Sequence, residues 1–364
     1  MRIGTGAFDG RLAVQQRVLP DYRVPFFELL AQACKGGMSL FAGQPRPEEG
    51  IQTATQLQHG EVRLARNLHI FSGSLYMCHQ RGLVAWLEEW NPDALVLEAN
   101  PRYLSSAAAS AWMRKRGRKV IGWGLGAPPA SGPFANIRRR RRIAFLKRFD
   151  GLIAYSERGA REYAELGFAA DRIFVAHNAV SPAPTIGLSR RPSAGKQLSV
   201  LFVGRLQQRK RVDLLLRAAA EMEPKPRLVI VGDGPERGDL ERLARSVYPS
   251  ALFAGSQKGA ELERYFQEAD LLVLPGTGGL AVQQAMAHAL PVIVARGDGT
   301  QDDLVRASNG WQIPSDDLAS LVAAMRNALS DLPRLRQMGS ESLRIVSEEI
   351  NIEKMVETFL RALR

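Results

Sequence analysis

The chain has 364 residues and a formal net charge of +12, with 45% hydrophobic and 24% charged residues. This length and balance exclude a disordered chain and predict two globular domains, and the two cysteines are too few for a disulfide framework or a structural zinc site. The sequence has no run of 18 apolar residues, which argues against a membrane-spanning helix, while its positive charge favours an anionic partner.

The first part of the chain alternates short apolar runs with helical patterns. Strands are expected at residues 11–17, 38–42, 93–98, 119–123, 151–155 and 173–176. Helices are expected at residues 25–34, 83–89, 105–116 and 157–166. Apolar runs separated by such helices indicate βαβ units and therefore a parallel sheet.

The alternation stops at residues 181–195, which are rich in Pro, Ser and Gly and have the composition of an interdomain linker. Further strands are expected at residues 198–203, 227–231, 251–253, 271–274 and 292–295, and further helices at 212–222, 238–247, 260–269, 280–289, 317–329 and 332–364. We therefore predict an α/β fold of two doubly wound domains facing across a cleft, with ligands at the carboxyl ends of the strands. The domains are expected at residues 1–180 and 196–345, followed by a last helix at 346–364.

A strand followed by a glycine and two cations begins at Leu198, in the run LSVLFVGRLQQRKRVDLLLRAA. Gly204 ends the strand and allows a close approach of the backbone to a ligand. Arg205 and Lys210 come before a helix that starts near Val212, and cations beside a helix amino terminus form a site for an anion. The alternative is that both cations are solvated loop charges.

Two further segments follow in order: RLVIVGDGPE at residues 227–236 and LLVLPGTGGLAVQQAMAHALPVIVA at residues 271–295. Together with the run from Leu198, they resemble the nucleotide-sugar-binding domain of GT-B glycosyltransferases, specifically the retaining family GT4. The resemblance covers residues 197–345 well and extends back over residues 150–180. The first 120 residues agree only in the order of strands.

This resemblance implies a GT-B fold of two Rossmann-like domains. It also implies transfer of a sugar from a nucleotide-diphosphate sugar to a carbohydrate or lipid-linked acceptor, with retention and without a metal ion or other cofactor. Arg205 and Lys210 match the pair that holds the donor diphosphate, where fixed cations stabilise the charge that builds on the leaving group. In the family, the last helix, here near residues 350–363, packs back on the first domain.

The chain departs from the family after the strand at residues 271–274. The family carries two glutamates eight positions apart, and Gly276 and Gln284 stand in their places. Gln284 can still hydrogen-bond a ribose, while Gly276 offers only its backbone. The resemblance and the glycine-rich loop together give the expected donor-binding residues, which are Gly204, Gly232, Gly276, Thr277, Gly278, Gly279, Leu280 and Gln284.

Three places in the first domain are candidates for contacts with the acceptor. Tyr22 and Arg23 are expected to be exposed in the loop after the first strand, and a plain strand-to-helix connection is the alternative there. Polar residues end and follow the strand at 93–98, a position that favours ligand contact. Where the family often has a histidine, residues 120–126 contain Trp123 instead. The acceptor candidates are therefore Tyr22, Arg23, Glu98, Asn100, Arg102 and Trp123.

Five consecutive arginines, Arg138–Arg142, precede the apolar residues Ile143, Phe145, Leu146 and Phe149. On a helix these four apolar residues lie within an arc of roughly 160°, although one of the arginines falls inside that arc. The pattern predicts a basic amphipathic helix on an anionic membrane surface. A phosphate-bearing acceptor and a solvated face are the alternatives, while nucleic acid is not expected because aromatic residues are not interleaved with the basic run.

The sequence therefore predicts a glycosyltransferase that acts in the synthesis of a surface polysaccharide or a lipid-linked glycan. Because residues 1–10 contain no apolar run that could act as a signal peptide, we expect it in the cytoplasm, peripheral on the inner face of the membrane. Two alternatives stay open. A nucleotide-sugar epimerase shares the GT-B architecture, and a catalytically inactive GT-B binding protein would explain the missing glutamate pair.

Overall fold

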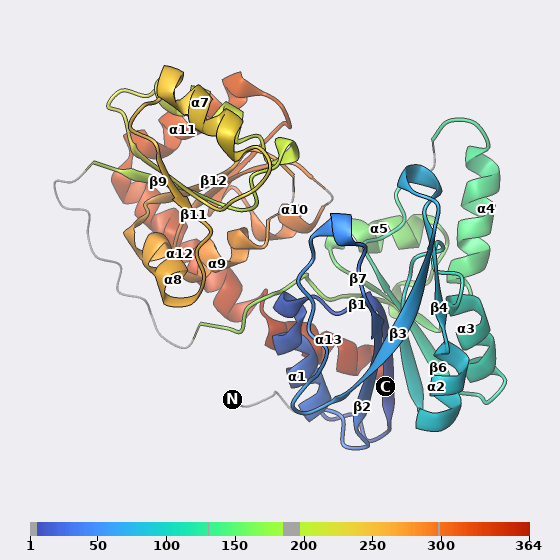
Figure 1. Cartoon of the computed structure of the whole chain (residues 1–364). Coiled ribbons are helices and arrows are strands. Elements are labelled where there is room, and N and C mark those ends of the chain that lie inside the picture. Colours follow the sequence, from blue (N-terminus) through green and yellow to red (C-terminus); the bar gives the residue numbers. More distant parts are fainter. Residues whose placement is uncertain (1–5, 130, 185–196, 278, 298) are drawn as a thin grey trace. The chain divides into compact units, whose positions relative to one another are not determined.

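The computed structural model describes residues 6–129, 131–184, 197–277, 279–297 and 299–364. It divides into two compact units (Figure 1). Unit 1 comprises Met1–Pro182 and Ile352–Arg364, and unit 2 comprises Ala183–Asn351. The last helix thus belongs to unit 1. Of the expected linker, residues 185–195 lie outside the described residues.

Unit 1 is built on an eight-stranded sheet in the order β4-β3-β2-β1-β5-β6-β7-β8. Its strands are β1 (Leu12–Val18), β2 (Met38–Gly43), β3 (Glu61–Ile70), β4 (Met77–Arg81), β5 (Ala94–Glu98), β6 (Lys119–Gly124), β7 (Gly151–Ala154) and β8 (Ile173–Val175). β3 and β4 pair antiparallel, and the other neighbours pair parallel. The strand order reverses between β1 and β5, and ligands of doubly wound sheets bind at the carboxyl ends of the strands beside such a reversal.

Helices cover both faces of this sheet. They are α1 (Val24–Gln32), α2 (Leu83–Trp90), α3 (Ser106–Arg114), α4 (Ala135–Leu146), α5 (Glu157–Glu165) and α13 (Ile352–Leu363). α1 and α13 share a core with Leu12 and Val14 of β1, whereas α2, α3, α4 and α5 share the other core with Ala13. The two cores take alternate residues of β1, because successive side chains of a strand point to opposite faces of the sheet.

The last helix completes the first of these cores. Phe359 of α13 is fully buried, and its ring centroid lies 5.0 Å from that of Phe26 and 4.9 Å from that of Trp123. We expect Phe359→Ala to lower the free energy of unfolding by about 3–5 kcal/mol, because it leaves a cavity. Equilibrium denaturation measures this, with Arg361→Ala at an exposed position of the same helix as the control. Equal losses in the two variants would mean that α13 contributes little to the core.

Unit 2 has a six-stranded parallel sheet in the order β11-β10-β9-β12-β13-β14. Its strands are β9 (Ser199–Val203), β10 (Arg227–Val231), β11 (Leu252–Gly255), β12 (Leu271–Leu274), β13 (Val292–Ala295) and β14 (Gly310–Ile313). Its helices are α6 (Val212–Ala220), α7 (Arg237–Val247), α8 (Gly259–Glu268), α9 (Ala281–Ala287), α10 (Thr300–Leu304), α11 (Leu318–Ser330) and α12 (Leu332–Glu348). The strand order reverses between β9 and β12, which marks the carboxyl ends of these two strands as the expected ligand site.

The predicted α/β class with mainly parallel sheets is confirmed. β10, β12 and β13 have the predicted bounds, and the other expected elements differ by a few residues at their ends. Four elements of the structure were not predicted from the sequence: the hairpin strands β3 and β4, the strand β14 and the helix α10. The sequence of β4, MCHQR, is mostly polar and short, so no apolar alternation marks it as a strand. The long helical pattern at the end of the chain is two helices, α12 and α13, which are separated at residues 349–351.

Candidate functional site

Three strand-end loops of unit 2 are joined by backbone hydrogen bonds beside the reversal between β9 and β12. In the loop after β9, the amide of Leu206 donates to the carbonyl of Asp233, at 2.9 Å, in the loop after β10. In the loop after β12, the amide of Thr277 donates to the carbonyl of Arg209 at 3.0 Å. The loop expected to bind an anion is therefore fixed from both sides.

The loops approach each other so closely at two positions that only glycine fits there. Gly232 has a φ of 141°, and a Cβ there would lie 1.9 Å from the carbonyl oxygen of Gly204. A Cβ at Gly276 would lie 2.2 Å from the carbonyl oxygen of Arg209 and 2.5 Å from Cα of Lys210. The position at which the resemblance implies a glutamate therefore has no room for a side chain in this chain.

Lys210 lies next to this contact between the loops. Its side chain is buried, and its Nζ donates to the carbonyl oxygen of Thr277 at 2.8 Å. Burial, together with the nearby guanidinium of Arg209, lowers the pKa of Lys210 to about 8. Because hydrogen bonds between ionised groups are the stronger ones, this ammonium group is suited to an anion such as a diphosphate.

The other expected donor-binding residues lie around the same loops. Arg205 is exposed in the loop between β9 and α6, so the predicted cation pair has one exposed and one buried member. Leu280 is exposed just before α9, and Gln284 is half-buried within it. A Cβ at Gly279 would lie 2.5 Å from Cδ1 of Leu274. Gly278 lies outside the described residues.

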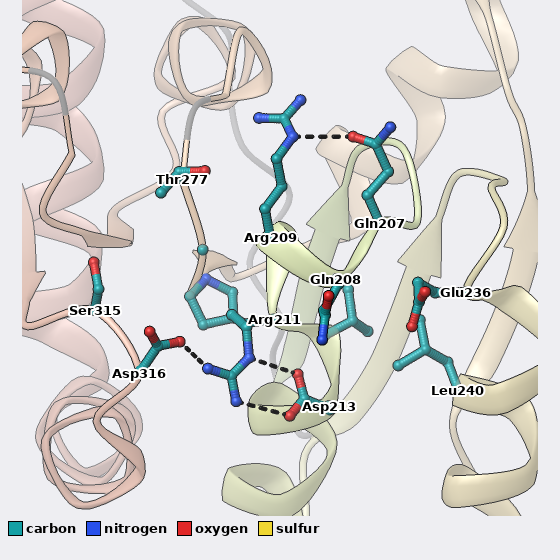
Figure 2. Close-up of a pocket in the computed structure, with 13 residues that line it drawn as sticks. Gln207, Gln208, Arg209, Arg211, Asp213, Glu236, Leu240, Thr277, Ser315 and Asp316 are labelled. Carbon is teal, nitrogen blue, oxygen red and sulfur yellow. Dashed lines mark hydrogen bonds and ion pairs between the residues drawn. The ribbon is translucent and has the colours of Figure 1, made fainter. Parts of the chain in front are cut away.

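A pocket of about 670 Å³ opens beside these loops (Figure 2). It is lined by Gln207, Gln208, Arg209, Arg211, Val212, Asp213, Glu236, Leu240, Pro275, Gly276, Thr277, Ser315 and Asp316. Among the described donor-binding candidates, Gly276 and Thr277 line it. Arg211 pairs with Asp213, at 3.0 Å, and with Asp316, so its charge is neutralised within the wall of the pocket.

In unit 1, Glu98 ends β5 at the reversal of the sheet. Its carboxylate accepts a hydrogen bond from the amide of Arg17, at 2.5 Å, and its own amide donates to Oε1 of Gln15 at 3.2 Å. Burial raises the pKa of Glu98 to about 7. Asn100 and Arg102 follow in the next loop, where the amide of Arg102 donates to Oδ1 of Asn100 at 3.1 Å. These three acceptor candidates therefore lie where the topology favours a ligand.

We expect Glu98→Gln to stabilise the protein at about pH 8 and to have little effect at about pH 4. The folded protein keeps the proton of Glu98 up to a pKa of about 7, whereas the ordinary carboxyl value is 4.5. The wild type therefore loses stability as the pH rises between these values, by at most roughly 3 kcal/mol, and the amide does not. Urea denaturation at both pH values measures the difference. A difference that is independent of pH would contradict the burial of this carboxyl group.

Two acceptor candidates lie within the core of unit 1. Arg23, which was expected to be exposed, is buried: its guanidinium lies 5.3 Å from the ring centre of Trp123 and 5.6 Å from that of Tyr155, and its Nη1 donates to the carbonyl of Ala179 at 3.3 Å. Trp123 is itself fully buried in the same core. The aromatic rings and the backbone carbonyl compensate the buried guanidinium. Tyr22 remains 43% exposed.

A cluster of polar and aromatic side chains near the end of β1 is not predicted from the sequence. Arg17 forms an ion pair with Glu49 at 2.8 Å, and the guanidinium of Arg46 lies 4.5 Å from the ring centre of Tyr76. Nδ1 of His69 lies 2.9 Å from the hydroxyl of Tyr76. His69 is carried by β3, so the cluster depends on the unpredicted hairpin. The alternation of polar and apolar residues in Glu61–Ile70 was the available signal.

The apolar arc expected to face a membrane belongs instead to the protein core. Phe145, Leu146 and Phe149 are buried against α3 and α5, and Ile143 is half-buried. The prediction that this arc faces a bilayer is therefore wrong. No helix in the described part of the chain is long and apolar enough to cross a membrane. The same residues contain no group of three or more His, Cys, Asp or Glu side chains that could hold a metal ion.

Two models of known families match most of the chain. Residues 197–331 match the model described as glycosyl transferases group 1, and residues 39–183 match the model described as glycosyltransferase family 4. The second match includes residues 39–120, where the sequence alone showed only a similar order of strands.

Individual relatives agree with these matches. The chain is 33% identical over 138 residues to the sulfoquinovosyl transferase of Arabidopsis thaliana, covering 36% of this chain and 26% of that protein. It is 38% identical over 130 residues to a GDP-mannose-dependent alpha-mannosyltransferase of Mycobacterium tuberculosis, covering 35% of this chain and 33% of the relative. The matched segments thus span about a quarter to a third of the length of these curated relatives.

A solved structure shows the same fold over nearly the whole chain. The Anabaena protein HepE, in complex with UDP, aligns with a TM-score of 0.71 and 16% identity, covering 96% of this chain and 98% of that protein. At 16% identity this similarity supports the fold alone, whereas the two family models match the sequence. The chain therefore belongs to the GT4-like glycosyltransferase family with the GT-B fold.

Proposed function

We propose that the chain is a glycosyltransferase in which unit 2 binds a nucleoside-diphosphate sugar and unit 1 binds the acceptor. The burial of Lys210 at the reversal of the unit 2 sheet is the observation that carries the proposal. Ligands of doubly wound sheets bind at this place, and an ammonium group forms strong hydrogen bonds with a diphosphate. Because the relatives include a GDP-mannose-dependent enzyme and a protein bound to UDP, the proposal leaves the base of the donor open.

In the proposed reaction, the bond between the anomeric carbon and a diphosphate oxygen breaks, and an acceptor hydroxyl oxygen forms a new bond to the same carbon. The hydroxyl proton passes to the departing diphosphate, so atoms and charge balance without a covalent enzyme intermediate or a metal ion. Lys210 and Arg205 stabilise the negative charge that grows on the diphosphate, and they do so more strongly in the transition state than before it. Family resemblance favours retention, which requires attack from the face that the diphosphate leaves.

On the acceptor side, we propose Glu98, Asn100 and Arg102 as contacts, together with the exposed Tyr22. With a pKa of about 7, Glu98 is present in both protonation states near neutral pH. It can therefore accept a hydrogen bond from a sugar hydroxyl or donate one to it. A lipid-linked glycan or a surface polysaccharide made at the cytoplasmic face of a membrane is the acceptor class that we propose.

Product analysis separates this function from its alternatives. The full chain is incubated with UDP-, GDP-, ADP- and dTDP-sugars, and NMR follows the donor with water as the first acceptor. A transferase releases the nucleoside diphosphate and a free sugar, and the first anomer to appear gives the stereochemistry. An epimerase converts the donor to its epimer with the diphosphate bond intact. Binding of a donor without either product, also after addition of glycan and lipid-linked acceptors, would support the inactive binding protein.

A further inference from the structure

The polar and aromatic cluster near the end of β1 lies where several strands of the unit 1 sheet end. β1, β2, β3 and β5 run parallel, so their carboxyl ends lie at the same edge, and the antiparallel β4 starts there. The cluster adjoins an acceptor candidate, because the amide of Arg17 donates to the carboxylate of Glu98 at 2.5 Å. Ligands of doubly wound sheets bind at this edge, and the proposed function leaves the side chains of the cluster without a role.

Two guanidinium groups border the ring of Tyr76 in this cluster. The guanidinium of Arg46 lies 4.5 Å from the ring centre, and that of Arg17 lies 6.0 Å from it. The two arginine side chains are 18% and 13% exposed, respectively. Both charges are thus largely withdrawn from bulk water, where like charges repel each other more strongly, but neither is closed off from the surface.

The carboxylates of the cluster balance one of these charges better than the other. Arg17 pairs with Glu49 at 2.8 Å. Although burial opposes it, the hydrogen bonds from Arg17 and from the amide of Arg46 hold the pKa of Glu49 below its ordinary value. Arg46 has a weaker counterpart, because Glu48 lies 3.8 Å away and is 69% exposed. Arg46 also donates to the carbonyl of Phe71, which carries no charge. The cluster therefore has an excess of positive charge.

His69 reflects the sign of this charge. Its Nδ1 lies 2.9 Å from the hydroxyl of Tyr76. Burial lowers the pKa of His69, and the charges of Arg17 and Arg46 lower it further. The positive potential that disfavours a protonated imidazole favours a bound anion. Glu98, with a pKa of about 7, opposes this potential only in part near neutral pH.

We propose that Arg17 and Arg46 bind an oxyanion on the acceptor, so that the acceptor is a sugar that carries a phosphate or a carboxylate. This inference rests on the proposed function, because it names the class of acceptor that unit 1 binds. A guanidinium can donate two parallel hydrogen bonds to a phosphate or a carboxylate, and such bonds between ionised groups are the stronger ones. A neutral sugar would leave the excess positive charge of the cluster unbalanced.

NMR titration of the full chain with four probes tests the proposal: glucose, glucose 6-phosphate, glucuronate and inorganic phosphate. We expect one of the two charged sugars to bind about tenfold or more tightly than glucose and than inorganic phosphate, because a hydrogen bond to a charged group contributes about this factor. The tighter of the two identifies the oxyanion. Lys210→Met, which removes the buried cation of the donor site, should leave this binding unchanged. Equal binding of glucose and both charged sugars, phosphate that binds as tightly as the charged sugars, or loss of their binding in Lys210→Met would each overturn the proposal.

Variants of Arg46 locate the subsite. We expect Arg46→Gln to weaken binding of the charged sugar about tenfold and to leave binding of glucose unchanged. Arg46→Lys keeps the charge and should lose less. The matched control is Arg66→Gln on β3. Arg66 is exposed and precedes Asn67, whose side chain donates to the carbonyl of Arg17 at 2.8 Å, so Arg66 points to the other face of the sheet.

The selectivity separates binding of an oxyanion from a merely structural role. If Arg46 only held the loop through the carbonyl of Phe71, Arg46→Gln would weaken glucose and the charged sugar equally, which would overturn the proposal. An equal loss in Arg66→Gln would overturn it as well. Transfer from a nucleotide sugar with a preference for neutral acceptors would contradict this inference alone. Selective binding of the charged sugar by a chain that binds no nucleotide would contradict the proposed function and leave an anion-binding site in unit 1.

Discussion

Replacement of Lys210 by methionine should abolish binding of the donor and, at the same time, raise the melting temperature of the empty protein. The pKa of about 8 means that burial and Arg209 make the charged form of Lys210 roughly 3 kcal/mol less favourable than in water. Loss of the hydrogen bond to Thr277 offsets about 1 kcal/mol of the gain. We therefore expect a net stabilisation of about 1–2 kcal/mol near pH 7, or a few degrees in melting temperature.

The stabilisation expected for Lys210→Met depends on pH. Between the folded pKa of about 8 and the ordinary value of 10.5, the unfolded chain binds more protons than the folded protein. The wild type therefore gains stability as the pH rises through this window, and the advantage of Lys210→Met shrinks. Thermal melts at about pH 7 and about pH 10 measure this, with Arg205→Met as the control, because its exposed side chain should affect donor binding but not stability. A methionine variant that is less stable than the wild type at pH 7 would contradict a costly buried ammonium.

Restoring the family glutamate at position 276 should destroy the site rather than improve it. A Cβ at Gly276 would already lie 2.2 Å from the carbonyl oxygen of Arg209, and the backbone there is tied to the next loop by the amide of Thr277. We expect Gly276→Glu to lower the free energy of unfolding by about 3 kcal/mol or more and to eliminate donor binding.

The second family glutamate gives the matched comparison. Gln284 is half-buried in α9, and Gln284→Glu changes charge without adding volume, so we expect it to fold with nearly unchanged stability. Chemical denaturation and donor titration of both variants provide the measurement. If Gly276→Glu folded as well as Gln284→Glu and increased turnover, the close contact between the two loops would not exist as described.

The sequence predicts much of the fold because apolar periodicity reports burial directly. β10, β12 and β13 are short apolar runs between helices, and both their bounds and their parallel pairing follow from the pattern. Apolar periodicity does not predict the β3–β4 hairpin. Most residues of β4 are polar, and β4 is a strand because it pairs with β3 rather than because of its own side chains. The alternation of polar and apolar residues in Glu61–Ile70 is a signal for β3 alone.

In the candidate site, the sequence predicts which loop carries a residue but not whether that residue is buried. The motif places Lys210 in the right loop, but its burial depends on contact with residues far along the chain, as its bond to Thr277 shows. Arg23 looks like a loop cation in the sequence and is buried because Trp123 and Tyr155 surround it. Likewise, periodicity identifies the apolar arc that contains Phe145, but it does not tell whether protein or lipid covers that arc.

Titration of the wild type with UDP, GDP, ADP and dTDP by calorimetry, without metal and at about pH 7 and about pH 9.5, tests the central claim most directly. A diphosphate binds the protonated form of Lys210, whose pKa in the free protein is about 8. We predict that one nucleotide binds at pH 7, that its dissociation constant rises by about 30-fold at the higher pH, and that Lys210→Met removes both the binding and its pH dependence. Absence of binding by all four nucleotides at millimolar concentration, or binding that depends on neither pH nor Lys210, would contradict a donor site in unit 2.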